Sequence, residues 1–109
     1  MAPEKEPNIV AKRLRMARQQ TGLSQKRLGI LAGIDEFCAS ARINQYERGK
    51  HIPDIYMTER LAHVMNVPMC YLYCEDDEMA AGLLQWYQMA APDKERLRKL
   101  LQQALTADS

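Results

Sequence analysis

Apolar residues recur along most of the chain at the three- and four-residue spacing of amphipathic helices. The first such run covers about residues 8–20. Asn8 is suited to cap its start, and Gly22 is suited to the left-handed conformation that ends a helix. The pattern therefore predicts a first helix whose buried face consists of Val10, Leu14 and Ala17.

The same reading continues to the end of the chain and shows no strand pattern and no internal repeat. Ser24 and Asp54 are good N-caps, and Pro68 suits the first turn of a short helix. The carboxylates at 75–78 fit either a hinge or the negatively charged start of a helix. We predict an all-α chain with further helices over about 25–32, 41–48, 55–65, 68–73, 78–90 and 93–106.

Residues 35–39 allow two interpretations. Ser40 can cap a helix over 41–48, with the preceding residues in a loop. Asp35 can instead cap a longer helix that begins about one turn earlier. The pattern alone does not choose between them.

Composition narrows the class of protein. A chain of 109 residues builds one or two small helical units, not a large enzyme fold. It has two His, no Ser-His-Asp grouping and no Gly-rich phosphate loop, so we expect no enzyme. Residues 1–74 hold eleven Lys and Arg against seven Asp and Glu, whereas 75–109 hold four against seven. The basic part is expected to meet an anionic partner.

The chain has no apolar run long enough to cross a membrane and no secretory signal at its start. With three cysteines, these features indicate a reducing, cytoplasmic location. Cys70 and Cys74 lie on one helical face, and with His63 they raise the idea of a metal site. The spacing lacks the second ligand pair of structural zinc sites, so we interpret the thiols as core residues and expect no metal and no cofactor.

Two short helices joined by a Gly-containing turn indicate a helix-turn-helix, which alone is a weak signal. The motifs around the turn are stronger: Gly22-Leu23-Ser24-Gln25, and later Tyr46-Glu47-Arg48-Gly49-Lys50. In this order they resemble the Cro/C1-type (XRE) family of phage and bacterial DNA-binding regulators. The resemblance covers about 9–73 and implies a five-helix, lambda-repressor-like domain.

The resemblance also implies a mode of DNA binding, in which the third helix enters the major groove and reads base edges. Arg pairs with guanine, and Asn or Gln pairs with adenine. The matching positions are Ser40, Ala41, Arg42, Asn44 and Gln45. Phosphate contacts are expected from Gln25, Lys26, Arg13, Arg27, Arg48 and Lys50. Arg18 and Glu47 are expected to form a structural salt bridge between the first and third helices.

The chain departs from the family between Gly33 and Tyr46, where it is about four residues longer. Asp35-Glu36-Phe37-Cys38 is therefore an apparent insertion. We favour a bulged loop over a longer third helix, with Phe37 plugging the insert onto the core. A redox role for Cys38 is not favoured, because no neighbouring base or second thiol is evident.

These features predict a disordered arm at 1–7, a DNA-binding domain at 8–74 and a C-terminal helical hairpin at 75–109. The hairpin carries an apolar stripe at Leu97, Leu100, Leu101, Ala104 and Leu105, which packs within the chain or across a homodimer axis. We expect a sequence-specific regulator, a repressor on a double-stranded operator, bacterial or phage-encoded and associated with the nucleoid. The alternative is a protein-interaction module, such as an antitoxin or antagonist-controlled regulator, acting through the hairpin.

Overall fold

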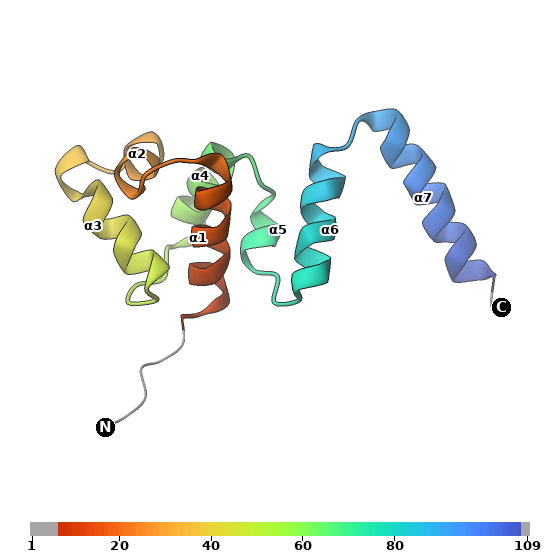
Figure 1. Cartoon of the computed structure of the whole chain (residues 1–109), viewed down its shortest axis with the longest axis horizontal. Coiled ribbons are helices and arrows are strands. Elements are labelled where there is room, and N and C mark those ends of the chain that lie inside the picture. The colour runs from red at the N-terminus through yellow and green to blue at the C-terminus, as the bar shows by residue number, and fades with distance from the viewer. Residues whose placement is uncertain (1–6, 108–109) are drawn as a thin grey trace, which may run out of the picture.

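The structure is a computed structural model that describes residues 7–107. All regular structure in this range is helical, with no strand. The predicted arm at 1–7 lies outside the described residues, apart from Pro7. The helices are α1 (Ile9–Thr21), α2 (Gln25–Leu31), α3 (Glu36–Glu47), α4 (Ile55–Met65), α5 (Met69–Leu72), α6 (Asp77–Gln88) and α7 (Ala91–Thr106). Figure 1 shows α1 to α5 grouped together, α6 beside them and α7 extending away.

The helix caps predicted at Asn8, Ser24 and Asp54 are observed, because each depends on groups only a few residues away. Side-chain oxygens of Asn8, Ser24 and Asp54 each accept a hydrogen bond from the backbone N–H three residues on, at 2.8–3.0 Å. Gly22 and Asn66 end α1 and α4 with φ values of 73° and 57°. These caps satisfy backbone groups that a helix terminus leaves without partners.

The core is formed by the helices α1 to α5, and α6 covers one side of it. Leu14, Leu28, Ile43, Leu61 and Leu72 are its largest aliphatic members, and each is at most 1% exposed. From α6, Ala80 joins this core. The inward face predicted for the first helix, Val10, Leu14 and Ala17, is therefore buried as expected.

The loop predicted for the insertion is wrong. Asp35 caps α3, its Oδ1 accepting from the N–H of Phe37 at 2.9 Å, and the added residues form the first helical turn. Four residues are close to one turn, so the phase of the rest of α3 is preserved. Ala39 is fully buried and anchors this turn against α2.

Phe37 is not the plug that we predicted. Its side chain is 89% exposed, while Ala39 occupies the inward position of the same turn. The insertion thus adds one turn to the N-terminal end of α3 and leaves the side chain of Phe37 in solvent.

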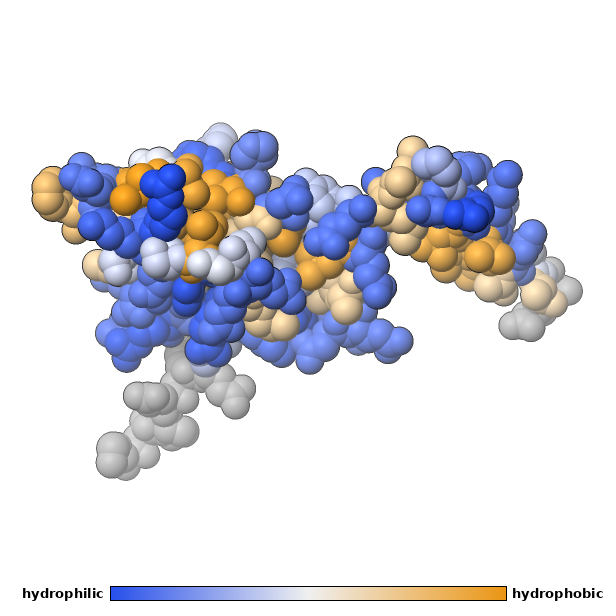
Figure 2. Space-filling model, turned by 45° about the horizontal axis from the view of Figure 1, so that its top comes forward, coloured by the Kyte–Doolittle hydropathy of each residue, from blue (hydrophilic) through white to orange (hydrophobic). Residues whose placement is uncertain are grey.

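The C-terminal helices do not close into a packed hairpin. Asp76 caps α6, and Asp77 and Glu78 lie in its first turn, so the acidic run is a helix start rather than a hinge. No residue of α7 is buried. Of its apolar stripe only Leu97 is half-buried and the rest is exposed, and Figure 2 shows apolar surface gathered along one side of this helix. Within 7–107 no helix is long and apolar enough to span a membrane.

Candidate nucleic-acid interface

The amphipathic character of α3 separates a core face from an outer face. Ala39, Ile43 and Tyr46 point inward and are buried. Of the predicted base-contacting residues, Ser40, Ala41 and Arg42 are exposed, and Asn44 and Gln45 are half-buried. All five therefore lie on one helix, held on the opposite side by the core.

The start of α2 is tied to the middle of α3. Gln25 Nε2 donates to Asn44 Oδ1 at 3.3 Å and to Glu47 Oε1 at 3.4 Å. Gln25 and Asn44 were predicted for separate roles, as phosphate and base contacts. Their hydrogen bond fixes the position of Asn44 relative to the N-terminus of α2.

Arg18 and Glu47 form a two-pronged ion pair between α1 and α3. Nε of Arg18 lies 2.6 Å from Oε2 of Glu47, and its second terminal nitrogen lies 2.9 Å from Oε1. The remaining terminal nitrogen donates to the carbonyl of Leu23 at 3.0 Å. The hydrogen bond with Glu47 raises the pKa of Arg18, against the opposing effect of burial. This pair locks α3 onto α1 and onto the turn before α2.

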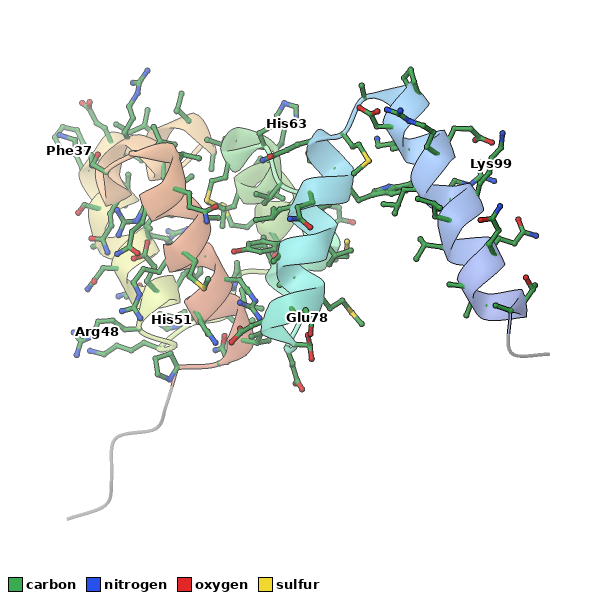
Figure 3. All side chains as sticks on the ribbon, turned by 45° about the vertical axis from the view of Figure 1, so that its right-hand side comes forward. Phe37, Arg48, His51, His63, Glu78 and Lys99 are labelled. Carbon is green, nitrogen blue, oxygen red and sulfur yellow. The ribbon has the colours of Figure 1, made fainter. Side chains whose placement is uncertain are left out.

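Basic residues lie at both ends of the helix-turn-helix. Lys26 and Arg27 are exposed in the first turn of α2, and Arg48 and Lys50 are exposed just beyond the end of α3. Figure 3 shows Arg48 on the outer edge of the molecule, on the side away from α6 and α7. All four side chains are exposed and remain candidates for phosphate contacts.

Arg13, also predicted to contact phosphate, is 1% exposed and has a structural position instead. Its Nε donates to the carbonyl of Cys74 at 2.8 Å, and a terminal nitrogen lies 2.8 Å from Oδ1 of Asp77. Its guanidinium also lies over the ring of Tyr71. We therefore remove Arg13 from the candidate interface.

Our sequence interpretation favoured Phe37 as a plug on the core over a wedge into DNA, and so left it out of the predicted outer face. It precedes Ala41 by four residues, a spacing that puts both on one face if the helix begins at Asp35. This four-residue spacing is visible in the sequence, but it is informative only if Asp35 rather than Ser40 caps the helix.

The cysteines also need correction. Cys70 is exposed rather than a core thiol, while Cys74 is half-buried against the core. Among the described residues there is no group of three or more His, Cys, Asp or Glu that could hold a metal ion.

The outer face of α3 offers a guanidinium, amides and a hydroxyl on a rigid helix, with exposed cations at the start of α2 and just beyond the end of α3. An α-helix fits the major groove of B-form DNA, where such groups can pair with base edges. This chemistry suits an interface with duplex DNA.

Comparisons with known proteins agree with this arrangement. No curated protein matches the chain. A solved structure described as the crystal structure of transcriptional regulator BswR is similar over 91% of this chain and 98% of its own, with 46% identity and a TM-score of 0.88. The model of the helix-turn-helix domain family matches residues 9–70. This chain therefore belongs to the helix-turn-helix domain family.

Proposed function

We propose that this protein is a sequence-specific, DNA-binding transcriptional regulator of the Cro/C1 (XRE) type that reads the major groove with α3. The observation that carries this proposal is the outer face of α3, which is open to solvent while its other face is locked into the core. The family match and the similarity to a transcriptional regulator support the same class of function.

In this proposal Arg42 pairs with guanine, and Asn44 and Gln45 pair with adenine, while Ser40 and Ala41 make closer, less selective contacts. A well-placed bidentate pair discriminates by about 1–3 kcal/mol against the wrong base. The hydrogen bond from Gln25 holds Asn44 in place before DNA arrives.

Phosphate contacts would come from the start of α2 and the end of α3. Lys26 and Arg27 hold one backbone strand, and Arg48 and Lys50 hold the other. Such contacts position the helix without reading sequence. The regulator then acts as a repressor, bacterial or phage-encoded, by occupying an operator that polymerase needs.

We assign separate roles to the two parts of the chain on the basis of which side chains are exposed. Residues 8–74 would bind DNA, and 75–109 would join two copies. Leu100, Leu101 and Leu105 on α7 are 61%, 53% and 83% exposed, a stripe that a second copy would cover. Two linked helix-turn-helix units bind half-sites about one DNA turn apart, which a single unit cannot do.

The first test is selection from random duplex DNA at physiological salt, where non-specific binding is weak. A two-fold motif with half-sites about one helical turn, 34–36 Å, apart is the expected result. Failure of the folded protein to enrich any motif would overturn the proposal.

Arg42→Ala tests the reading helix directly. We expect at least a tenfold loss of affinity for the selected site and relaxed preference at one guanine, since one good pair is worth about 1–3 kcal/mol. Arg98→Ala removes the same charge from an exposed position on α7 and is the matched control. Equal effects of the two variants would mean that only net charge matters.

The dimer has its own test. Sedimentation of the full chain should show two copies, and Leu101→Glu should give monomers with an unchanged helix content. A monomeric wild-type protein would remove the dimer from the proposal.

The exposed stripe of α7 also favours the second candidate, a module that binds an antagonist or a toxin through its C-terminal helices. This candidate requires a monomeric chain, or a dimer whose α7 remains exposed. Protection of α7 amides from hydrogen exchange in the free protein would exclude it.

A further inference from the structure

The added first turn of α3 carries a large aromatic side chain in solvent. Phe37 is 89% exposed, although its backbone N–H is held by the cap at Asp35. The exposed phenyl ring keeps a large apolar surface in water, and burying that surface against a partner would be favourable. The ring contributes nothing to the core, and its whole apolar face is accessible to a partner outside the chain.

The direction of this side chain follows from the phase of the helix. Ala41 lies one turn after Phe37, and Arg48 lies eleven residues, or about three turns, after it. Both are exposed, while Ala39 and Ile43 define the buried side. Figure 3 shows Phe37 and Arg48 at the two ends of α3, both on the outer edge of the molecule. Phe37 is therefore continuous with the face that we propose reads DNA.

Base edges in the major groove present one apolar group, the C5-methyl of thymine, and Phe is among the side chains that contact it. The neighbours of Phe37 favour a base edge over the sugar-phosphate backbone. Asp35 and Glu36 are adjacent carboxylates, and phosphates would repel them, whereas base edges include the amino donor of cytosine.

We infer that Phe37 is a specificity-determining residue that packs on a thymine methyl at one edge of each half-site. This inference rests on the proposed function and extends its reading face by one turn. Four residues of helix advance about 6 Å, nearly two base-pair steps of 3.4 Å. The thymine is therefore expected beyond the base pair that faces Ala41, by at most about two base pairs.

The test compares the wild-type protein with Phe37→Ala in the same selection from random duplexes. The wild-type motif should contain a thymine at the edge of each half-site. Phe37→Ala should lose that preference and keep the preferences assigned to Arg42 and Gln45. Because the ring is exposed, the melting temperature of the variant should equal that of the wild type.

A second arm removes only the methyl group. Replacing the edge thymine by deoxyuridine should weaken wild-type binding about fourfold, the effect of one buried methyl, and leave Phe37→Ala unaffected. Phe37→Leu should retain part of the methyl dependence. Deoxyuridine at a thymine outside the half-sites is the control and should change neither protein.

The outcomes separate the inference from the function it rests on. If the folded wild type enriches no motif, the proposed function fails and the inference fails with it. If wild type and Phe37→Ala enrich the same motif and respond equally to deoxyuridine, DNA binding stands and the inference is wrong. A changed oligomeric state with an unchanged motif would make Phe37 a protein contact and would also overturn the inference.

Discussion

At the scale of single residues, the charged side chain that is buried in the helix-turn-helix, Glu47, is held in an ion pair. Glu47 is 5% exposed and receives hydrogen bonds from Arg18 and from Gln25. The bidentate geometry offsets much of the cost of desolvating both charges. Removing one partner leaves the other buried without compensation, which is worse than removing both.

We therefore predict strong coupling between Arg18 and Glu47. Glu47→Ala should lower the free energy of unfolding by about 3 kcal/mol or more, the typical cost of breaking a buried pair. The double change Arg18→Ala with Glu47→Ala should cost clearly less than the sum of the two single changes. Urea denaturation of the four proteins completes the cycle, and additive effects would reject a structural pair.

At the scale of elements, α2 and α3 approach so closely that only a glycine fits between them. A Cβ added at Gly29 would lie 2.7 Å from the Cβ of Ala39 and 3.0 Å from its Cα. The second contact is backbone, so a side chain there must push the two helices apart. This close approach sets the angle at which the outer face of α3 is presented.

Gly29→Ala should therefore destabilise the fold by about 1–3 kcal/mol, as overpacking does. Gly82→Ala is the matched control, since Gly82 lies in α6 with open space around it. It should raise stability by about 0.5–1 kcal/mol through helix propensity. Adding Ala39→Gly to Gly29→Ala should restore part of the loss. Equal melting temperatures for the two single variants would contradict close packing of α2 on α3.

At the scale of the whole molecule, the first helix holds the C-terminal part of the chain. Oδ1 of Asp77 lies 3.0 Å from Nζ of Lys12 and 2.8 Å from a terminal nitrogen of Arg13. Hydrogen bonds from these two cations lower the pKa of Asp77. The folded protein thus binds this proton more weakly than the unfolded chain, so the ion pair stabilises the fold above about pH 4 and is lost as the pH falls through the folded pKa.

Asp77→Asn should remove this pH dependence. Between pH 7 and 3, wild-type stability should fall more steeply than that of the variant, because the amide that replaces the carboxylate has no proton to gain. Glu78→Gln, which changes an exposed carboxylate in the same turn, should follow the wild-type curve. Urea titrations at each pH measure this, and parallel curves for wild type and Asp77→Asn would contradict the role of the ion pair.

Local sequence sufficed for most of the fold. Caps at Asn8, Ser24 and Asp54 and the left-handed ends at Gly22 and Asn66 act through groups a few residues away. Apolar periodicity then shows which side of each helix must be covered. The candidate interface was predicted from the resemblance to the Cro/C1-type family, and local periodicity adds only that the polar side of α3 stays outside the core.

Tertiary contacts decided the rest, since they join residues that no local pattern relates. Asp35 and Ser40 are both competent caps, and the burial of Ala39 beside Gly29 selects Asp35 and turns Phe37 outward. The sequence pattern indicates that Arg13 is one more surface cation. In the fold its guanidinium instead donates a hydrogen bond to the carbonyl of Cys74, 61 residues away. Where two residues can each cap a helix, the choice between them depends on free energy gained from contacts across the fold. The same is true of a cation that becomes buried. Spacing along the chain does not encode either outcome.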